Sequence, residues 1–207
     1  MQRFVILALV LFCPGALGEF APDRADCARS TADQFFFPAG VLGKRTDHST
    51  RAWYSKHLSV MSEPSLSCKS SAAEAYRFLW LRTWGAPIAV RVERNGDVAT
   101  LSAVTLDGAG GYEPGVVAKR VQRNITAEEW KAFVDGLNKI EFWKMPGHVQ
   151  EGGFDGAQWI LEGRRGTQYH VVDRWSPKTG VYREFCLLIL EAAGLLPSGT
   201  GKRNGIY

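Results

Sequence analysis

The sequence predicts a single α+β domain, in which helices pack on an antiparallel sheet of about six strands in the order α-ββββ-α-ββ-α. Three observations carry this prediction. Strand-like alternation recurs in two hairpin-like pairs, and helical periodicity follows a capping box at Thr126. The 207 residues, 45% of them hydrophobic, are enough for one buried core and contain no internal repeat or linker.

The first 18 residues have the pattern of a cleaved signal peptide. Arg3 precedes an apolar run at 4–12, and small residues at 16 and 18 suit cleavage before Glu19. The run is too short to span a bilayer, so we expect a soluble mature chain, with a retained membrane anchor as the alternative. The chain then divides into an irregular segment at 19–49, the folded domain at 50–197 and a flexible tail at 198–207.

The domain is predicted to open with a helix and a buried strand. Ser49 or Thr50 caps the helix, and Pro64 follows its end. Residues 75–84 are apolar on both alternating faces, which favours a central strand covered on two sides. A helix capped by Ser71 is the alternative.

Residues 87–103 predict a β-hairpin. Apolar residues alternate over 88–92, and Asn95-Gly96 is a strong signal for a two-residue turn. Such a turn places Arg94 opposite Asp97 and keeps the apolar side chains on one face.

Three further elements complete the predicted order around a second hairpin. Residues 116–123 form a strand with a basic outer side, and the capping box at Thr126 begins a helix with an apolar stripe from Trp130 to Ile140. Residues 182–196 are apolar nearly all round and predict a buried helix.

The second hairpin is predicted from residues 157–161 and 168–175. An odd-length loop at 162–166 would place Trp159 opposite Tyr169 and leave His170 on the wetter face.

The same register provides the sharpest chemical hypothesis. It places Asp155 opposite Asp173, and two facing carboxylates repel unless they hold a cation or share a proton. Asp155, Asp173 and His170 are therefore the catalytic candidates. The alternative is that both aspartates cap turns and that His170 is a solvated strand residue.

Other catalytic chemistries have no complete motif in the chain. The four histidines lack zinc-binding spacing, no G-x-S-x-G occurs, and the glycine-rich stretches read as flexible surface loops without a full nucleotide or phosphate fingerprint. We therefore expect no metal and no cofactor. After cleavage, 24 basic residues stand against 21 acidic ones, too small an excess for a nucleic-acid partner.

Three cysteines remain after the expected cleavage. An oxidising compartment favours a structural disulfide between Cys27 and Cys68. Cys186 lies in the apolar run at 185–190 and is expected to be a small buried hydrophobe.

Two surface features predict binding. A basic patch would form if its strands are neighbours, with scattered solubilising charge as the alternative. Its members are Arg91, Lys119, Arg120, Arg123, Arg164 and Arg165. Tyr112, in the loop GGYEPG, is a candidate contact residue, unless it is tucked over its own turn.

Several phrases resemble those of uncharacterised exported bacterial proteins that have no assigned activity. They are WYSKHLSVMSEPSL (53–66), YRFLWLRTW (76–84), GAGGYEP (108–114), DGAQWILEG (155–163) and YHVVDRWSP (169–177). The resemblance covers roughly Trp53 to Leu196 and implies a bacterial source and a periplasmic or secreted location. It implies no catalytic or binding residues.

Together these features favour an exported, non-enzymatic binding protein with an unknown macromolecular partner in the periplasm. A protein partner is expected, as for an inhibitor or immunity protein. One alternative is a carboxylate-dependent hydrolase or cation-binding protein that uses Asp155 and Asp173. A structural envelope component is the other.

Overall fold

The computed structural model describes residues 35–43, 47–68, 73–149, 153 and 155–196. Within these ranges the chain forms one six-stranded antiparallel sheet with three α-helices, in the predicted order α-ββββ-α-ββ-α. The α+β prediction is therefore confirmed. The expected signal peptide, the expected tail at 198–207 and Cys27 lie outside the described residues.

The elements follow one another along the chain with short connections. They are α2 (Asp47–Val60), β1 (Glu74–Arg82), β2 (Ile88–Asn95), β3 (Val98–Leu106), β4 (Val117–Ile125), α3 (Ala127–Lys139), the 3-10 turn η1 (Phe142–Lys144), β5 (Ala157–Arg165), β6 (Gln168–Trp175) and α4 (Val181–Ala192). None of the helices in the described part of the chain is both long and apolar enough to cross a membrane.

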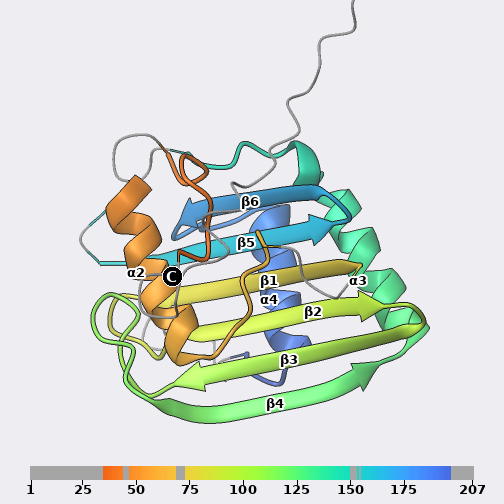
Figure 1. Cartoon of the computed structure of the whole chain (residues 1–207), viewed down its shortest axis with the longest axis horizontal. Coiled ribbons are helices and arrows are strands. Elements are labelled where there is room, and N and C mark those ends of the chain that lie inside the picture. The colour runs from red at the N-terminus through yellow and green to blue at the C-terminus, as the bar shows by residue number, and fades with distance from the viewer. Residues whose placement is uncertain (1–34, 44–46, 69–72, 150–152, 154, 197–207) are drawn as a thin grey trace, which may run out of the picture.

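The sheet lies between two helical layers, with α2 on one face and α3 and α4 on the other (Figure 1). The strand order is β4-β3-β2-β1-β5-β6, so β1 is an interior strand. Its residues 75–81 are buried on both sides, which confirms the prediction of a central strand and excludes the alternative helix. The sheet therefore has two separate cores, one on each face.

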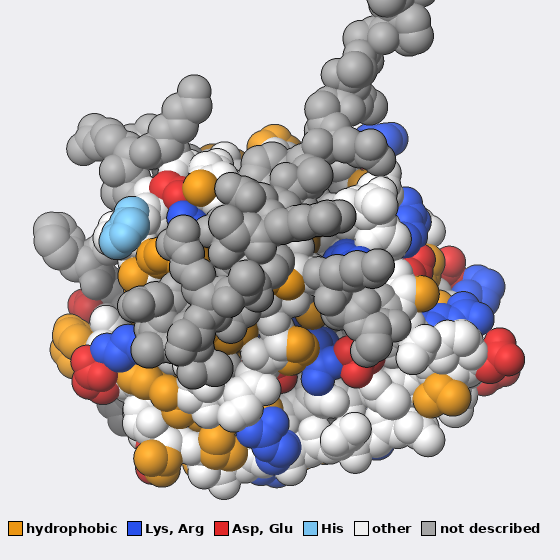
Figure 2. All heavy atoms as spheres, in the orientation of Figure 1, with side chains coloured by type: hydrophobic (Ala, Val, Ile, Leu, Met, Phe, Trp, Pro, Cys, Tyr) orange, Lys and Arg blue, Asp and Glu red, His pale blue; other side chains and the backbone are white. Residues whose placement is uncertain are grey.

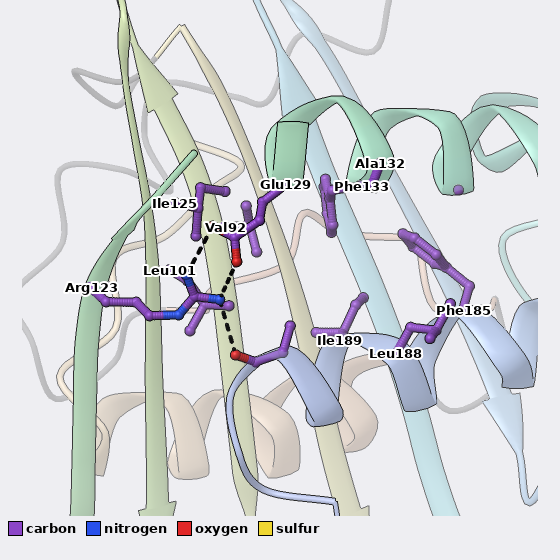
Figure 3. A pocket seen from close by; sticks show the side chains of 12 residues that line it. Val92, Leu101, Arg123, Ile125, Glu129, Ala132, Phe133, Phe185, Leu188 and Ile189 are labelled. Carbon is purple, nitrogen blue, oxygen red and sulfur yellow. Dashed lines mark hydrogen bonds and ion pairs between the residues drawn. The ribbon is translucent and has the colours of Figure 1, made fainter. Parts of the chain in front are cut away.

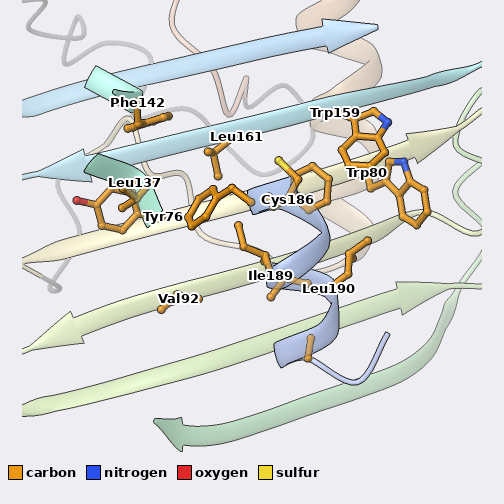
Figure 4. Packing of buried hydrophobic residues seen from close by; sticks show 14 of the residues in the cluster. Tyr76, Trp80, Val92, Leu137, Phe142, Trp159, Leu161, Cys186, Ile189 and Leu190 are labelled. Carbon is orange, nitrogen blue, oxygen red and sulfur yellow. The ribbon is translucent and has the colours of Figure 1, made fainter. Parts of the chain in front are cut away.

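The larger core lies between the sheet and α4. Ile189, Leu190 and Cys186 of α4 point towards the strands, where the rings of Trp80 and Trp159 lie 5.4 Å apart (Figure 4). All five side chains are buried. Replacing a buried tryptophan such as Trp80 or Trp159 by alanine typically lowers the free energy of unfolding by about 3–5 kcal/mol. Cys186 is free and buried, as its apolar surroundings predict.

The capping box at the start of α3 is present as predicted. The Thr126 hydroxyl accepts a hydrogen bond from the Glu129 N–H at 3.2 Å, and the Glu129 carboxylate accepts one from the Thr126 N–H at 2.8 Å. These bonds satisfy two backbone donors that the helix itself leaves free. Trp130 and Leu137 then turn into the core.

The first hairpin keeps its predicted faces but shifts its register by two residues. Asn95 pairs with Val98, so the turn is Gly96-Asp97. The predicted pairing of Arg94 with Asp97 is therefore wrong. Gly96 has φ +60° and occupies the first central position, where a two-residue turn with this geometry requires glycine.

The second hairpin has a register of the opposite parity to the prediction. Arg165 pairs with Gln168 across a two-residue turn, and Gly166 in that turn has φ +59°. The predicted odd-length loop at 162–166 is therefore wrong. Residues 162–165 continue β5, and the polar side chain of Glu162 is accommodated there by a buried partner, Arg77 of the neighbouring strand β1.

Candidate functional site

The structure separates the two candidate carboxylates. Asp173 pairs with Ile160 and faces α2, where it accepts a 2.9 Å hydrogen bond from the Tyr54 hydroxyl. Asp155 precedes β5 and accepts a 3.1 Å hydrogen bond from the indole Nε1 of Trp84. The predicted pairing of Asp155 with Asp173 is therefore wrong, since the true register moves Asp173 inward along β5.

Asp173 is a buried carboxylate that joins three segments of the fold. Its backbone N–H donates to the Gly147 carbonyl at 2.7 Å, and Nδ1 of His148 lies 3.9 Å from Oδ2. Oδ1 has no hydrogen-bond partner among the described residues. Burial raises the pKa of Asp173 to about 6, although Tyr54 and His148 both oppose this shift.

His170 lies on the opposite face of the sheet from Asp173. Its Nε2 is 3.0 Å from the Met145 carbonyl, and its ring meets Phe142 edge-on with centroids 5.1 Å apart. The ring is half-buried opposite Gly163, and burial lowers its pKa. The expected solvated histidine opposite Gln158 is therefore wrong, although the parity that separates His170 from Asp173 holds.

The predicted basic patch does not form as one surface. Lys119, Arg120 and Arg123 lie on β4, whereas Arg164 and Arg165 lie on β5. Three strands separate β4 from β5, so the strands are not neighbours.

Several of these arginines also have local structural partners. Arg91 is held 3.0 Å from the Glu63 carboxylate. Arg120 and Arg164 donate to backbone carbonyls at positions 61 and 68. These contacts favour scattered local roles for the basic residues.

Tyr112 does lie at the surface, and its ring is paired with that of Trp84. The ring centroids are 4.9 Å apart with an interplanar angle of 37°. Trp84 is 65% exposed and Tyr112 is 52% exposed, so neither ring is tucked into the core. Together with the nearby Trp53 and Trp175, these residues form a surface that we call the aromatic corner.

The glycine-rich loop at 108–114 holds Tyr112 against the end of β1. The Gly110 N–H donates to the Gly85 carbonyl at 3.0 Å, and the Gly111 N–H donates to the Thr83 carbonyl at 3.2 Å. A Cβ atom at Gly110 would lie 2.7 Å from backbone atoms of Arg82. The glycines therefore permit close backbone approach, in place of the flexible loop expected from the sequence.

A pocket of about 370 Å³ opens beside Tyr112. It is lined by Trp53, Thr83, Gly111, Tyr112, Gly153, Gln158 and Trp175, none of which is charged. Figure 2 shows hydrophobic side chains exposed at the left edge of the molecule, near α2 and the loop after β3, beside acidic and basic side chains. The aromatic corner thus combines two exposed rings with an adjoining hollow.

A second pocket, of about 260 Å³, lies between α3 and α4 (Figure 3). Its lining is mostly apolar, with Val92 and Leu101 from the sheet and Phe133 and Phe185 from the helices. Arg123 crosses one end, where it pairs with Glu129 at 2.8 Å and donates to the Ala192 carbonyl at 3.2 Å. Because that charge is already paired, the pocket suits an uncharged apolar group.

The α2 face also buries a group of charged side chains around Arg77. Nε of Arg77 donates to Glu162 at 2.8 Å, and Nη1 donates to Glu63 at 3.3 Å. Tyr169 donates to the other oxygen of Glu162 at 2.9 Å. Burial lowers the pKa of Arg77, but the two carboxylates outweigh it and raise the pKa. Since every partner is a protein group, we interpret this network as structural.

Within the described ranges, no group of three or more histidine, cysteine, aspartate or glutamate residues converges to hold a metal ion. The predicted Cys27–Cys68 bridge stays a prediction, because Cys27 lies outside the described residues.

Comparisons with protein-family models, with curated proteins and with solved structures found no match to this chain. The resemblance to exported bacterial proteins therefore stays an expectation. The candidate site depends on the geometry of the aromatic corner alone.

Proposed function

We propose that the chain is an exported binding protein, without catalytic activity of its own, that engages a macromolecular partner in the periplasm through the aromatic corner. The observation that carries the proposal is the adjacent pair Trp84 and Tyr112. Both rings are more than half exposed, and the loop beneath them is held by backbone hydrogen bonds.

Exposed rings of this size favour association. Apolar surface gains about 25 cal/mol per Å² when it leaves water, and tryptophan and tyrosine dominate the residues that contribute most to protein interfaces. Both side chains have few rotatable bonds, so fixing them in a complex costs little conformational entropy. A loop already held in place lowers that cost further.

The surroundings of the aromatic corner support a protein partner, as for an inhibitor or immunity protein. The two rings are flanked by the Asp155 carboxylate and by an ion pair between Lys56 and Glu113 at 2.5 Å. Aromatic residues surrounded by a polar, solvent-accessible rim are the usual anatomy of a protein interface. The hydrolase alternative loses the facing carboxylates on which it depended.

Affinity capture tests the proposal. Residues 19–207 would be used as bait in an extract of the source cell, with and without EDTA. The double variant Trp84→Ala, Tyr112→Ala removes both exposed rings, and Leu188→Ala is the matched control because Leu188 is 59% exposed on α4, on the other face of the sheet.

We expect the wild type and Leu188→Ala to retain one protein in stoichiometric amount, whether or not EDTA is present. We expect the double variant to lose it, with affinity reduced by about 1,000-fold, which corresponds to two interface contacts of about 2 kcal/mol each. Equal retention by the double variant, or capture that depends on a divalent cation, would contradict the proposal.

A further inference from the structure

Three aromatic rings from three distant parts of the chain line the pocket of the aromatic corner. Trp53 comes from α2, Tyr112 from the glycine-rich loop and Trp175 from the end of β6. An aromatic face carries partial negative charge and attracts a cation within about 6 Å of the ring centre. Several rings around one space are therefore suited to an ammonium or guanidinium group.

The charged side chains around the pocket also favour a cation. Among the described residues that line the pocket, none is charged and none is basic. The Asp155 carboxylate lies beside the pocket and accepts a hydrogen bond from the Trp84 indole. This partner is neutral, so it leaves the negative charge of Asp155 uncompensated. Lys56 is held by Glu113, so these two charges offset each other. The field of the described residues at this site therefore favours an incoming positive charge.

The rings are held in position before any ligand arrives. Nε1 of Trp53 donates to the Gly110 carbonyl at 2.7 Å. Trp175 is packed closely against two glycines: a Cβ atom at Gly156 would lie 2.4 Å from its Cζ2, and one at Gly153 would lie 3.0 Å from its Nε1. Fixed rings reduce the cost of assembling a site around a cation.

We infer that this pocket receives a cationic side chain, lysine or arginine, from the protein partner. The volume of about 370 Å³ admits the charged head group together with part of its aliphatic stem. Gln158 adds a neutral amide oxygen to the lining, which suits the N–H donors of such a head group. The identity of the inserted group rests on the proposed function, whereas the preference of the pocket for cations is a property of the chain itself.

The preference can be measured with small probes. Choline, lysine amide and arginine amide would be titrated against residues 19–207, with tryptophan fluorescence and the indole Nε1–H signals of a two-dimensional NMR spectrum as readouts. The matched neutral probe is 3,3-dimethyl-1-butanol, which has the shape of choline with carbon in place of the charged nitrogen.

We expect the three cations to bind with dissociation constants in the millimolar range, and the neutral alcohol to bind about tenfold more weakly. Asp155→Asn should reduce the affinity for the cations by about two- to fivefold, and the reduction should be smaller at high salt. Tyr112→Ala and Trp175→Ala should each abolish binding, and Leu188→Ala should change nothing. Asp155→Asn and Tyr112→Ala alter exposed side chains, so they keep the test valid if Trp175→Ala fails to fold.

Equal binding of choline and its neutral analogue, or binding of none of the probes at 100 mM, would overturn the inference. If capture of a protein still depended on Trp84 and Tyr112 in that case, the proposed function would stand without it. Cation binding with no captured protein would instead remove the proposed function. Association with phosphatidylcholine vesicles, but not with lysine or arginine amides, would overturn the assignment of the cation to a protein side chain.

Discussion

The hydroxyl of Tyr54 donates a 2.9 Å hydrogen bond to the carboxylate of Asp173, and both side chains are buried where α2 meets β6. Asp173 is one of the three catalytic candidates that the sequence suggests. Its position under α2 makes it a structural connection between a helix and the sheet, and this position has a measurable consequence for stability.

The stability of the protein should depend on the ionisation of Asp173. Burial raises its pKa from 3.8 to about 6, so the folded state binds this proton more tightly than the unfolded state. The resulting stabilisation is fully present below pH 3.8 and is lost as the pH rises through about 6. A shift of this size corresponds to about 3 kcal/mol.

Urea unfolding between pH 3.5 and 7 measures this effect. The free energy of unfolding of the wild type, relative to that of Asp173→Asn, should fall by about 3 kcal/mol across that range. His148→Gln removes a group that lowers the pKa of Asp173, so the loss should then occur at higher pH. Parallel curves for wild type and Asp173→Asn would show that the carboxylate does not titrate in this window.

Arg77 should be among the least replaceable residues of the domain. Arg77→Met leaves Glu162 buried without its cation and leaves Glu63 with Arg91 alone, and breaking a buried pair in this way typically costs about 3–5 kcal/mol. Lys131→Met is the matched surface control, because Lys131 pairs with Asp135 in solvent and should contribute little. A double-mutant cycle with Glu162→Gln should give a coupling energy well above that of the surface pair. Additive losses would refute the coupling.

Gly110→Ala should disturb the glycine-rich loop at 108–114. The added Cβ would meet the backbone of Arg82 at 2.7 Å, so the loop must move away from β1, at a cost of about 1–3 kcal/mol. Partner binding should fall with it, because Tyr112 moves too. Gly166→Ala strains a left-handed turn with open space around it, and should destabilise the fold by about 1 kcal/mol while partner binding stays intact. Unchanged partner binding by the Gly110→Ala variant would show that the loop does not take part in recognition.

Local patterns in the sequence were sufficient for the fold class and for several elements. The capping box at Thr126, the apolar run of residues 75–84 and the alternating faces of the first hairpin each depend on neighbours along the chain. Each was predicted correctly for that reason. The shift in the first hairpin changed partners by two residues and left the faces unchanged, because side chains alternate with a period of two.

The register of the second hairpin could not be predicted because it depends on a distant residue. Glu162 looks like a loop residue when only its neighbours are considered. In the fold it pairs with Arg77, which is 85 positions away, and so it remains in a buried strand. With residues 162–165 in β5, the turn has two residues, β5 and β6 pair with the opposite parity to the prediction, and Asp173 lies opposite Ile160.

The candidate site was only partly visible in the sequence, for the same reason. Tyr112 was singled out as a large ring in a glycine-rich loop, and that residue does lie at the centre of the aromatic corner. The tryptophans at 53, 84 and 175 belong to separate elements, and Trp53 bonds to a loop residue 57 positions away. Only the folded arrangement brings them to one surface.

The most direct test of the aromatic corner is an NMR spectrum of the seven tryptophan indole N–H groups, recorded before and after addition of the captured partner. We predict that the signals of Trp53, Trp84 and Trp175 shift or broaden, while those of the other four, Trp80, Trp130, Trp143 and Trp159, stay in place. A partner that moves the second group and leaves the first unchanged would contradict the account and place recognition elsewhere on the molecule.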